Sequence, residues 1–296
     1  MRDGVKERKA VDLHVHSNKS DGTFTPSELV DYAIEKGLAA MALTDHDTVA
    51  GLGEIREYAA KVPGAPEIIN GIELSTDLDG RDIHIVGLFI DDENPRFLGE
   101  LQKFRDSREL RNEKMCAGLK EGLGMDISLK QLREEFPGSV LTRGHYAKYM
   151  LHHGYVRTMR EAFEKWIGDD GPYFVPREKI TPVDGIKLIN MAGGVPVLAH
   201  PIQYAYSHNK LENLLVEWKE AGLVAMETVY TTYSAEDMAE YKAMAEKLGL
   251  LESGGSDFHG TNKVNTDLAT GRGNLFVPYE FLEKLRVYSD NMKKGA

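Results

Sequence analysis

Segments with a strand pattern alternate with segments with a helix pattern along most of this chain, and this alternation limits the folds it can adopt. Apolar stretches with strand character occur at residues 9–16, 39–47, 67–76, 82–90, 194–201, 223–230 and 250–260. Amphipathic stretches follow most of them, such as residues 25–38, which begin with the helix-start pair Thr25 and Pro26. The pattern predicts a parallel α/β architecture. We favour a barrel over an open sheet because no glycine-rich dinucleotide turn follows the first strand.

Residues 91–182 interrupt this rhythm. They contain several helix patterns and no clear strand pattern. We therefore expect a barrel formed by residues 1–90 and 183–296, with residues 91–182 inserted as a helical cap.

Composition excludes several classes of protein. The net charge of −11 argues against a broadly basic surface for nucleic acid. No apolar run approaches the roughly 18–20 residues that a membrane helix needs, and the single cysteine, Cys116, fits a reducing compartment. We expect a cytoplasmic protein without a membrane or an obligate protein partner.

The first strand alternates polar and apolar side chains. Asp12, His14 and His16 occupy every second position, with Val11, Leu13 and Val15 between them. Since residues two apart in a strand point the same way, this spacing predicts one polar and one apolar face.

Nearly every predicted strand ends in a side chain that can bind a metal ion. The set comprises His14, His16, Asp21, Asp45, His46, Asp47, Glu73, His84, His200, Asp257 and His259. In a parallel barrel the carboxyl ends of the strands meet at one mouth, so we expect these side chains to converge. Burying them uncompensated would cost on the order of several kcal/mol each, which a metal cluster would offset. Imidazoles and carboxylates without a thiolate suit Mn, Fe or Zn, and there are enough ligands for two or three divalent ions.

Five stretches resemble, in order, the motifs of the PHP (polymerase and histidinol phosphatase) family of metal-dependent phosphoesterases. They are DLHVHSNKSDGTFTPSELV, ALTDHDTVAG, GIELS, VLAHP and SGGSDFHG. The resemblance covers almost the whole chain and is greatest to the TrpH-like group, which includes 3′,5′-nucleoside bisphosphate phosphatases and 5′-to-3′ exoribonucleases. It implies a distorted (β/α)7 TIM-like barrel with an inserted helical cap.

The resemblance also implies a trinuclear metal centre. His14, His16 and Asp257 match the ligands of a first ion, and His84 and His200 match those of a second. Glu73 would bridge these two, and Asp21, His46 and His259 match the ligands of a third. For Asp12 two roles stay open: holding a ligand imidazole in its tautomer, or binding another deep polar partner.

This centre predicts hydrolysis of a phosphate monoester by a hydroxide that bridges two metal ions, with the third ion, His46 or Asp47 assisting the leaving group. The expected substrate is a small phosphorylated molecule, a nucleoside 3′,5′-bisphosphate that loses its 3′-phosphate. The alternatives are a 5′-to-3′ exoribonuclease acting on short RNA, a phosphatase for another small molecule, and a non-catalytic, metal-stabilised binding module.

We expect the cap to contact the substrate. The candidates are Arg143, His145, Lys148, Tyr173 and Arg177, because arginine forks suit phosphate. For Arg143 and Arg177 the alternative is a surface salt bridge. Residues 94–114 hold six basic and four acidic side chains, which predicts a solvated helix face. Tyr230 and Tyr233 stand where many relatives carry a histidine, and this departure leaves the substrate open.

Overall fold

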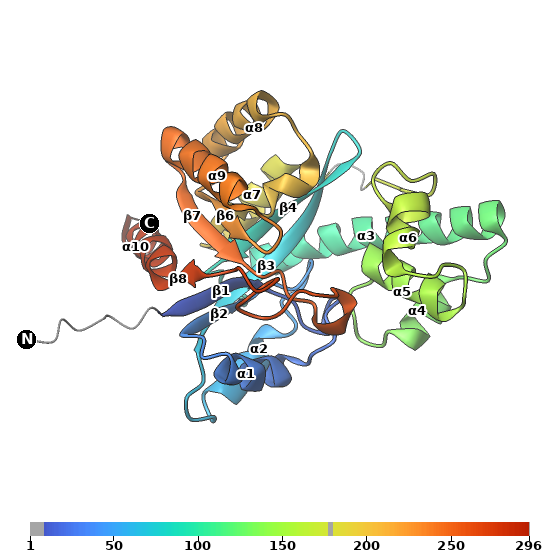
Figure 1. Cartoon of the computed structure of the whole chain (residues 1–296), viewed down its shortest axis with the longest axis horizontal. Coiled ribbons are helices and arrows are strands. Elements are labelled where there is room, and N and C mark those ends of the chain that lie inside the picture. Colours follow the sequence, from blue (N-terminus) through green and yellow to red (C-terminus); the bar gives the residue numbers. More distant parts are fainter. Residues whose placement is uncertain (1–8, 177–179, 296) are drawn as a thin grey trace, which may run out of the picture.

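A barrel-shaped sheet surrounded by helices forms one part of the molecule, and a group of helices projects from one side of it (Figure 1). The computed structural model describes residues 9–176 and 180–295. The strands are β1 (Ala10–Val15), β2 (Ala40–Leu43), β3 (Glu67–Leu78), β4 (Arg81–Leu88), β5 (Val195–Leu198), β6 (Ala225–Tyr230), β7 (Leu251–Gly255) and β8 (Val277–Pro278). They form one sheet in the order β7-β6-β5-β4-β3-β2-β1-β8.

The sheet closes on itself at the carboxyl ends of β1 and β7. The backbone N–H of His16 donates to the carbonyl of Phe258 at 3.0 Å, and the N–H of Asp257 donates to the carbonyl of His14 at 2.9 Å. A parallel bridge between Val15 and Phe258 accompanies these bonds. The predicted α/β barrel is therefore confirmed, and its closure places the ends of the first and last long strands side by side.

Two strands run against the parallel direction, which the sequence pattern did not predict. β4 is antiparallel to both β3 and β5, and β8 is antiparallel to β1. Asp79 and Gly80 form a two-residue turn with positive φ at both positions, which is typical of a tight hairpin. A two-residue connection cannot cross over the sheet, so β4 must return antiparallel.

β1 also departs from simple alternation. Its pairing with β2 shifts register between Asp12 and Val15. As a result Val15 packs in the hydrophobic cluster that contains Leu29, whereas Val11 and Leu13 pack in a second cluster with Leu282. The prediction of a single apolar face on this strand was wrong.

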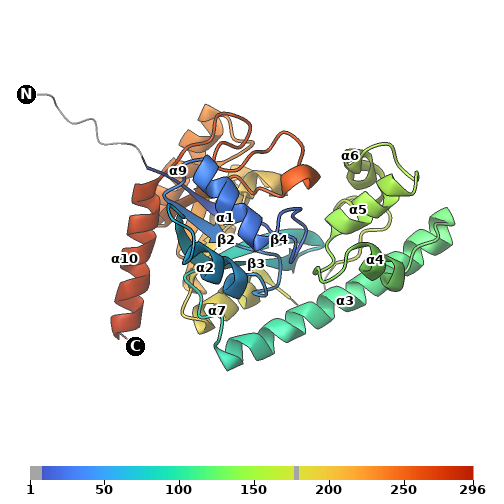
Figure 2. The same cartoon turned by 90° about the horizontal axis from the view of Figure 1, so that it is seen from below.

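Helices cover the barrel on its outside and at one end. They are α1 (Pro26–Glu35), α2 (Leu52–Ala59), α7 (Pro182–Met191), α8 (His208–Glu220), α9 (Ala235–Leu248) and α10 (Tyr279–Gly295). α1 begins as predicted: Thr25 accepts from the N–H of Glu28, and Glu28 accepts from the N–H of Thr25. α10 lies on the opposite side of the barrel from the projecting helices (Figure 2).

The projecting helices lie between residues 95 and 167. They are α3 (Pro95–Leu123), α4 (Leu129–Glu135), α5 (Arg143–His152), α6 (Met159–Ala162) and the π-helical turn Phe163–Ile167. Among the described residues from 91 to 182 there is no strand. We call residues 95–176 the cap; the domain limits at 91 and 182 stay a prediction.

α3 joins the cap to the barrel (Figure 2). Phe97 and Leu101, near its start, pack in the barrel cluster, while Met115 and Leu119, near its end, pack in a separate cap cluster. One continuous helix thus holds the cap beside the mouth of the barrel. No helix in the part of the chain that the structure describes is long and apolar enough to cross a membrane.

Candidate metal centre

The nine predicted metal ligands converge at the mouth of the barrel. Their ligand atoms form four groups within which all atoms lie less than 4.8 Å apart. The groups are His16 with Asp21, His46 and His259; His14 with His16 and Glu73; His14 with His200 and Asp257; and His46 with Glu73 and His84. His84 and His200, which the resemblance assigns to one ion, both face Glu73 Oε1, and the division of the nine ligands among the ions stays a prediction.

Glu73 lies at the middle of this arrangement. Its Oε2 is 3.2 Å from His14 Nε2, 3.1 Å from His16 Nε2 and 3.2 Å from His46 Nδ1. Its Oε1 is 2.9 Å from His84 Nδ1 and 3.0 Å from His200 Nε2. One fully buried carboxylate therefore faces five imidazoles.

The sequence pattern predicted that Glu73 ends its strand, and this prediction was wrong. β3 continues for five residues to Leu78, and β4 returns beside it, so that Ser75 pairs with His84. The hairpin therefore rises past the mouth toward the cap. Because β4 is reversed, His84 reaches the mouth from near the start of its strand.

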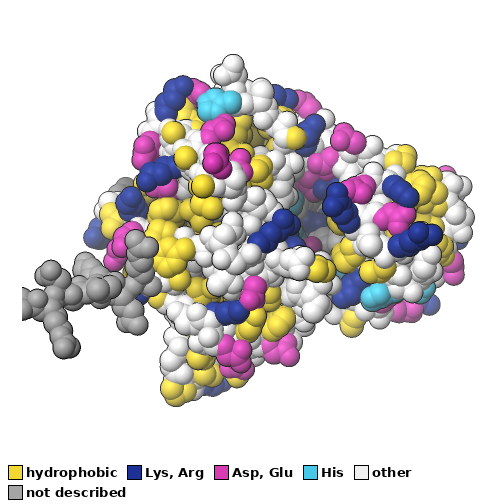
Figure 3. Space-filling view, in the orientation of Figure 1, with side chains coloured by type: hydrophobic (Ala, Val, Ile, Leu, Met, Phe, Trp, Pro, Cys, Tyr) yellow, Lys and Arg dark blue, Asp and Glu magenta, His cyan; other side chains and the backbone are white. Residues whose placement is uncertain are grey.

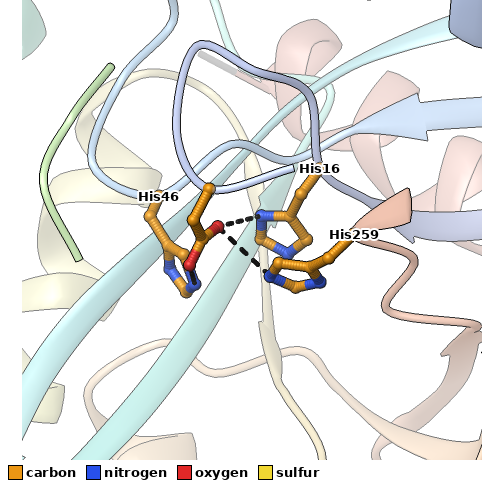
Figure 4. A group of neighbouring side chains, drawn as sticks. His16, His46 and His259 are labelled. Atoms are coloured by element: carbon orange, nitrogen blue, oxygen red, sulfur yellow. Dashed lines mark ion pairs between the residues drawn. The ribbon is translucent and has the colours of Figure 1, made fainter. Parts of the chain in front are cut away.

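A second corner of the centre forms around Asp21. Figure 4 shows His16, His46 and His259 converging there on one carboxylate. Asp21 Oδ1 is 3.2 Å from His259 Nε2 and 3.9 Å from His16 Nδ1, and Asp21 Oδ2 is 3.8 Å from His46 Nε2. The residues come from the loops after β1, β2 and β7, which share one edge of the barrel.

Burial and carboxylates act against each other on these imidazoles. Burial lowers the pKa of His84, but the carboxylates of Glu73 and Asp82 outweigh it and raise that pKa to about 10. At His46 burial prevails and lowers the pKa to about 3. Burial would raise the pKa of the Glu73 carboxyl, yet the surrounding imidazoles hold it well below its ordinary value. The centre therefore attracts positive charge, which protons or metal ions can supply.

The donor atoms fit metal ions. Eight buried atoms in the centre have no hydrogen-bond partner among the described residues: His14 Nε2, His16 Nδ1 and Nε2, Asp21 Oδ1, His46 Nδ1, Glu73 Oε2, His84 Nδ1 and His200 Nδ1. Buried polar atoms are normally paired, so this cluster of unpaired nitrogens and oxygens has the donor chemistry of a cation site.

The backbone is strained where two of these residues leave their strands. His200 has a φ of 28° and Asp257 a φ of 54°, both in the left-handed region. Such conformations cost on the order of 1 kcal/mol outside glycine. Each lies two residues after its strand, β5 or β7, and its side chain joins the centre, which is typical of strain at a functional site.

Glu227 on β6 is a functional residue that the sequence analysis missed. Its Oε1 lies 2.8 Å from His14 Nδ1, and its Oε2 accepts the backbone N–H of His200 at 2.6 Å. The carboxylate can only accept, so Nδ1 of His14 carries the proton and Nε2 is left for the centre. The available signal was an acid inside the otherwise apolar strand AMETVY.

The two tyrosines that depart from the family pattern belong to this supporting layer. Tyr230 donates to Asp257 Oδ2 at 2.7 Å, and Tyr233 donates to the carbonyl of Glu227 at 3.3 Å. Lys263 forms an ion pair with the same Oδ2 of Asp257. This leaves Oδ1 of Asp257 facing His14, His16 and His259.

Asp12 and Asp45 support the backbone around the centre. Asp12 accepts from the N–H and hydroxyl of Ser256 and from the N–H of Ala269. None of these three donors belongs to an imidazole ring. The second interpretation of Asp12 is thus the one that the structure supports. Asp45 accepts from Ser17 and Ser20 and fixes the loop that carries Asp21.

Asp47, predicted to assist the leaving group, is tied to the cap. Its carboxylate forms an ion pair with the guanidinium of Arg108 and accepts the N–H of Ser75 at 3.0 Å. Both carboxylate oxygens of Asp47 are therefore engaged as hydrogen-bond acceptors. The contacts therefore favour a structural role, and its proton transfer stays a prediction.

A pocket of about 170 Å³ opens between the centre and the cap, where Figure 3 shows a hollow with Lys and Arg side chains on its rim. Asp21, His46 and His84 line its barrel side, and Arg108, Arg111 and Arg143 line its cap side. Arg108 and Arg111 are each 3% exposed, so the prediction of a solvated helix face was wrong there.

Of the four predicted substrate contacts that the structure describes, one lines this pocket. Arg143 does, and its guanidinium donates to Asp82 at 3.0 Å and to Asp169 at 2.6 Å. His145 accepts the N–H of Thr142 instead, and Tyr173 packs over Gly122 of α3.

Lys148 lies over the ring of Phe136 at 5.9 Å, outside the residues that line the pocket. Arg177 lies outside the described residues. The contacts of the substrate with these predicted residues stay predictions.

Comparison with known proteins agrees with this geometry. Residues 12–174 match the PHP domain family. The chain is 33% identical over 258 residues to a 3′,5′-nucleoside bisphosphate phosphatase of Chromobacterium violaceum, covering 87% of this chain and 90% of that protein. It is 37% identical over 251 residues to a 5′-3′ exoribonuclease of Haemophilus influenzae, covering 85% and 90%.

Solved structures show the same fold. An amidohydrolase from Chromobacterium violaceum, with bound sulfate and no metal, superimposes with a TM-score of 0.82 at 31% identity, covering 94% of this chain and 96% of that one. A protein from Bifidobacterium adolescentis, proposed to be a metal-dependent phosphoesterase, gives 0.80 at 25% identity, covering 95% and 97%. With the converging His, Asp and Glu ligands, these matches show that the chain is a hydrolase of the PHP family.

Proposed function

We propose that the chain hydrolyses the 3′-phosphate of nucleoside 3′,5′-bisphosphates. The observation that carries this proposal is the pocket that has candidate metal ligands on one side and three arginines on the other. One phosphate would lie against the centre and a second against the arginines. The name of the Chromobacterium violaceum relative supports this choice of substrate.

The nine converging side chains would hold two or three divalent ions, Mn, Fe or Zn, because the donors are imidazoles and carboxylates without thiolate. When bound, such ions supply a hydroxide nucleophile and neutralise charge on the phosphoryl oxygens. Glu73 and Glu227 orient the imidazoles, and His46 is one of the predicted ligands that line the pocket, beside Asp21 and His84.

Arg143 is the residue that we propose to recognise the second phosphate. Its side chain is 14% exposed, and it already binds two carboxylates, those of Asp82 and Asp169. A phosphate would replace one of these carboxylates. Phosphate can accept two hydrogen bonds from the guanidinium fork, whereas a single carboxylate oxygen accepts one. The Asp82 carboxylate also lies 3.5 Å from His84 Nε2, so the arginine and the centre share one neighbour.

A 5′-to-3′ exoribonuclease acting on short RNA is the second candidate. The 37% identity to the Haemophilus influenzae exoribonuclease favours it. The same centre would serve both reactions, because each cleaves a phosphoester next to a second phosphate. The length of the accepted substrate then distinguishes them.

Phosphate release from adenosine 3′,5′-bisphosphate by the manganese-loaded protein tests the first proposal. AMP and a 5′-phosphorylated RNA trimer serve as parallel substrates. We expect release from the bisphosphate, little from AMP, and a large loss with Arg143→Ala. Arg160→Ala is the matched control, because Arg160 is a cap arginine that pairs with Glu164 on the exposed surface.

Three results would contradict parts of this proposal. Mononucleotide release from the trimer without bisphosphate cleavage would favour the exoribonuclease. Cleavage of an unrelated phosphoester alone would refute the nucleotide assignment and leave the metal centre. Full activity of Arg143→Ala would refute its role in phosphate recognition.

A further inference from the structure

A hydrogen bond from the cap reaches a predicted ligand of the candidate metal centre. Thr142, directly before α5, donates its hydroxyl to Asp21 Oδ2 at 2.7 Å. Both residues are buried, with Thr142 5% exposed and Asp21 8% exposed. Neither the family motifs nor the strand ends point to Thr142, because it lies in the cap, 121 residues from Asp21 in sequence.

We propose that Thr142 is a positioning residue that orients Asp21 for the ion held with His16, His46 and His259. The proposal rests on the metal centre proposed above, and it makes docking of the cap a condition for assembling that ion site. It does not depend on which phosphoester the enzyme cleaves.

The two oxygens of Asp21 have different surroundings, which is the geometric basis of the proposal. Oδ2 accepts the Thr142 hydroxyl, whereas Oδ1 is buried without a hydrogen-bond partner in the described part of the chain. Oδ1 is also the oxygen that lies 3.2 Å from His259 Nε2. The threonine therefore engages one oxygen and leaves the other available to an ion.

Thr142 is itself held firmly against the barrel. The N–H of Val140 donates to the carbonyl of Lys19 at 3.0 Å, and the Ser139 hydroxyl donates to the carbonyl of Asn18 at 2.9 Å. These bonds lay residues 139–142 along the loop that carries Asp21.

α3 and α5 complete the support of this segment. Asn112 of α3 donates to the carbonyl of Leu141 at 3.1 Å, and the Thr142 N–H donates to Nδ1 of His145 at 3.0 Å. His145, which we predicted to bind substrate, thereby supports Thr142. The next residue, Arg143, lines the pocket, so the residue that would bind substrate and the residue that orients Asp21 are neighbours on one segment. This predicts that substrate and ion each strengthen binding of the other.

The test measures manganese binding without substrate, by competition with a chelating dye, in Thr142→Val and Thr142→Ser. We expect Thr142→Val to lose about 10- to 100-fold in affinity for one ion while the others bind normally. Thr142→Ser keeps the hydroxyl and should recover most of the loss. Thr158→Val is the control, because Thr158 precedes α6 and accepts the N–H of Glu161 far from any metal ligand.

A purely structural role of Thr142 predicts a different pattern. Thermal melting of each variant shows whether the cap is still folded. Equal manganese binding by Thr142→Val and the wild type would overturn the proposal, as would an equal loss in Thr158→Val. If the wild type binds no manganese at all, the metal centre itself is refuted, and if only bisphosphate cleavage is absent, the proposed substrate alone is refuted.

Discussion

Replacing Glu227 by glutamine would test whether the centre depends on an acid that lies outside the ligand set. The carboxylate is 1% exposed and serves two ligands at once, His14 through its ring and His200 through its backbone. Glutamine has the same shape but only one accepting atom. If its NH₂ faces His14, Nδ1 must become the acceptor, and the imidazole proton then moves to Nε2, where it blocks metal binding.

The size of the effect follows from this geometry. If the NH₂ faces the backbone N–H of His200 instead, two donors meet in a buried site. A buried donor left without an acceptor costs about 1–3 kcal/mol. Loss of such supporting carboxylates lowers metal affinity or activity by about 10- to 100-fold, equivalent to roughly 1.4–2.7 kcal/mol. The two estimates agree, so we expect Glu227→Gln to bind at least one ion about 10- to 100-fold more weakly.

Dye competition for manganese and phosphate release under saturating metal provide the assay. Glu252→Gln is the matched control, because Glu252 on the neighbouring strand β7 accepts a bond from Thr228 at 3.0 Å but contacts no predicted ligand among the described residues. Wild-type metal affinity in Glu227→Gln would refute the reasoning about the His14 tautomer. An equal loss in Glu252→Gln would show that the strand, rather than the contact with His14, matters.

Three further outcomes follow from the contacts. Chelation of the metals should lower the melting temperature by roughly 5–10 °C in calorimetry, since ions that bind the folded state at about 100 times their dissociation constant stabilise it by about 2.7 kcal/mol; an unchanged melt would contradict a buried metal cluster. Arg108→Met should cost about 3 kcal/mol or more in urea unfolding because it removes the guanidinium from the buried Asp47, whereas the exposed Arg105→Met should stay within about 0.5 kcal/mol. Lys36→Met should cost at most about 1 kcal/mol, because its ion pair with Asp267 is partly exposed. Hydrogen bonds from Lys36 and Tyr32 outweigh burial and hold the pKa of Asp267 below its ordinary value. The loss of unfolding free energy in Lys36→Met should therefore shrink as the pH falls through that pKa, and a loss that grows in acid would contradict this reasoning.

The sequence determined the features that depend on near neighbours in the chain. Thr25 and Pro26 predict the start of α1, and the bonds between Thr25 and Glu28 that fix it lie within one helical turn. The strand patterns predict where most of the ligands leave their strands, and barrel geometry brings those ends together at the mouth. Glu73 and His84 reach the same place from inside the β3–β4 hairpin, which the strand patterns did not predict.

Only the tertiary structure decided which side chains face one another across elements. α3 shows the reason: its first turns pack on the barrel, its last turns pack in the cap, and Arg108 and Arg111 lie between, over the pocket. The barrel buries the start of α3 and the cap buries its end, so the helix has no single apolar stripe along its whole length. Its charged middle therefore has the sequence pattern of a solvated face. The bonds of Glu227 to His14 and of Thr142 to Asp21 likewise join residues more than 100 positions apart, and local periodicity shows which face is buried but carries no information on what lies opposite it.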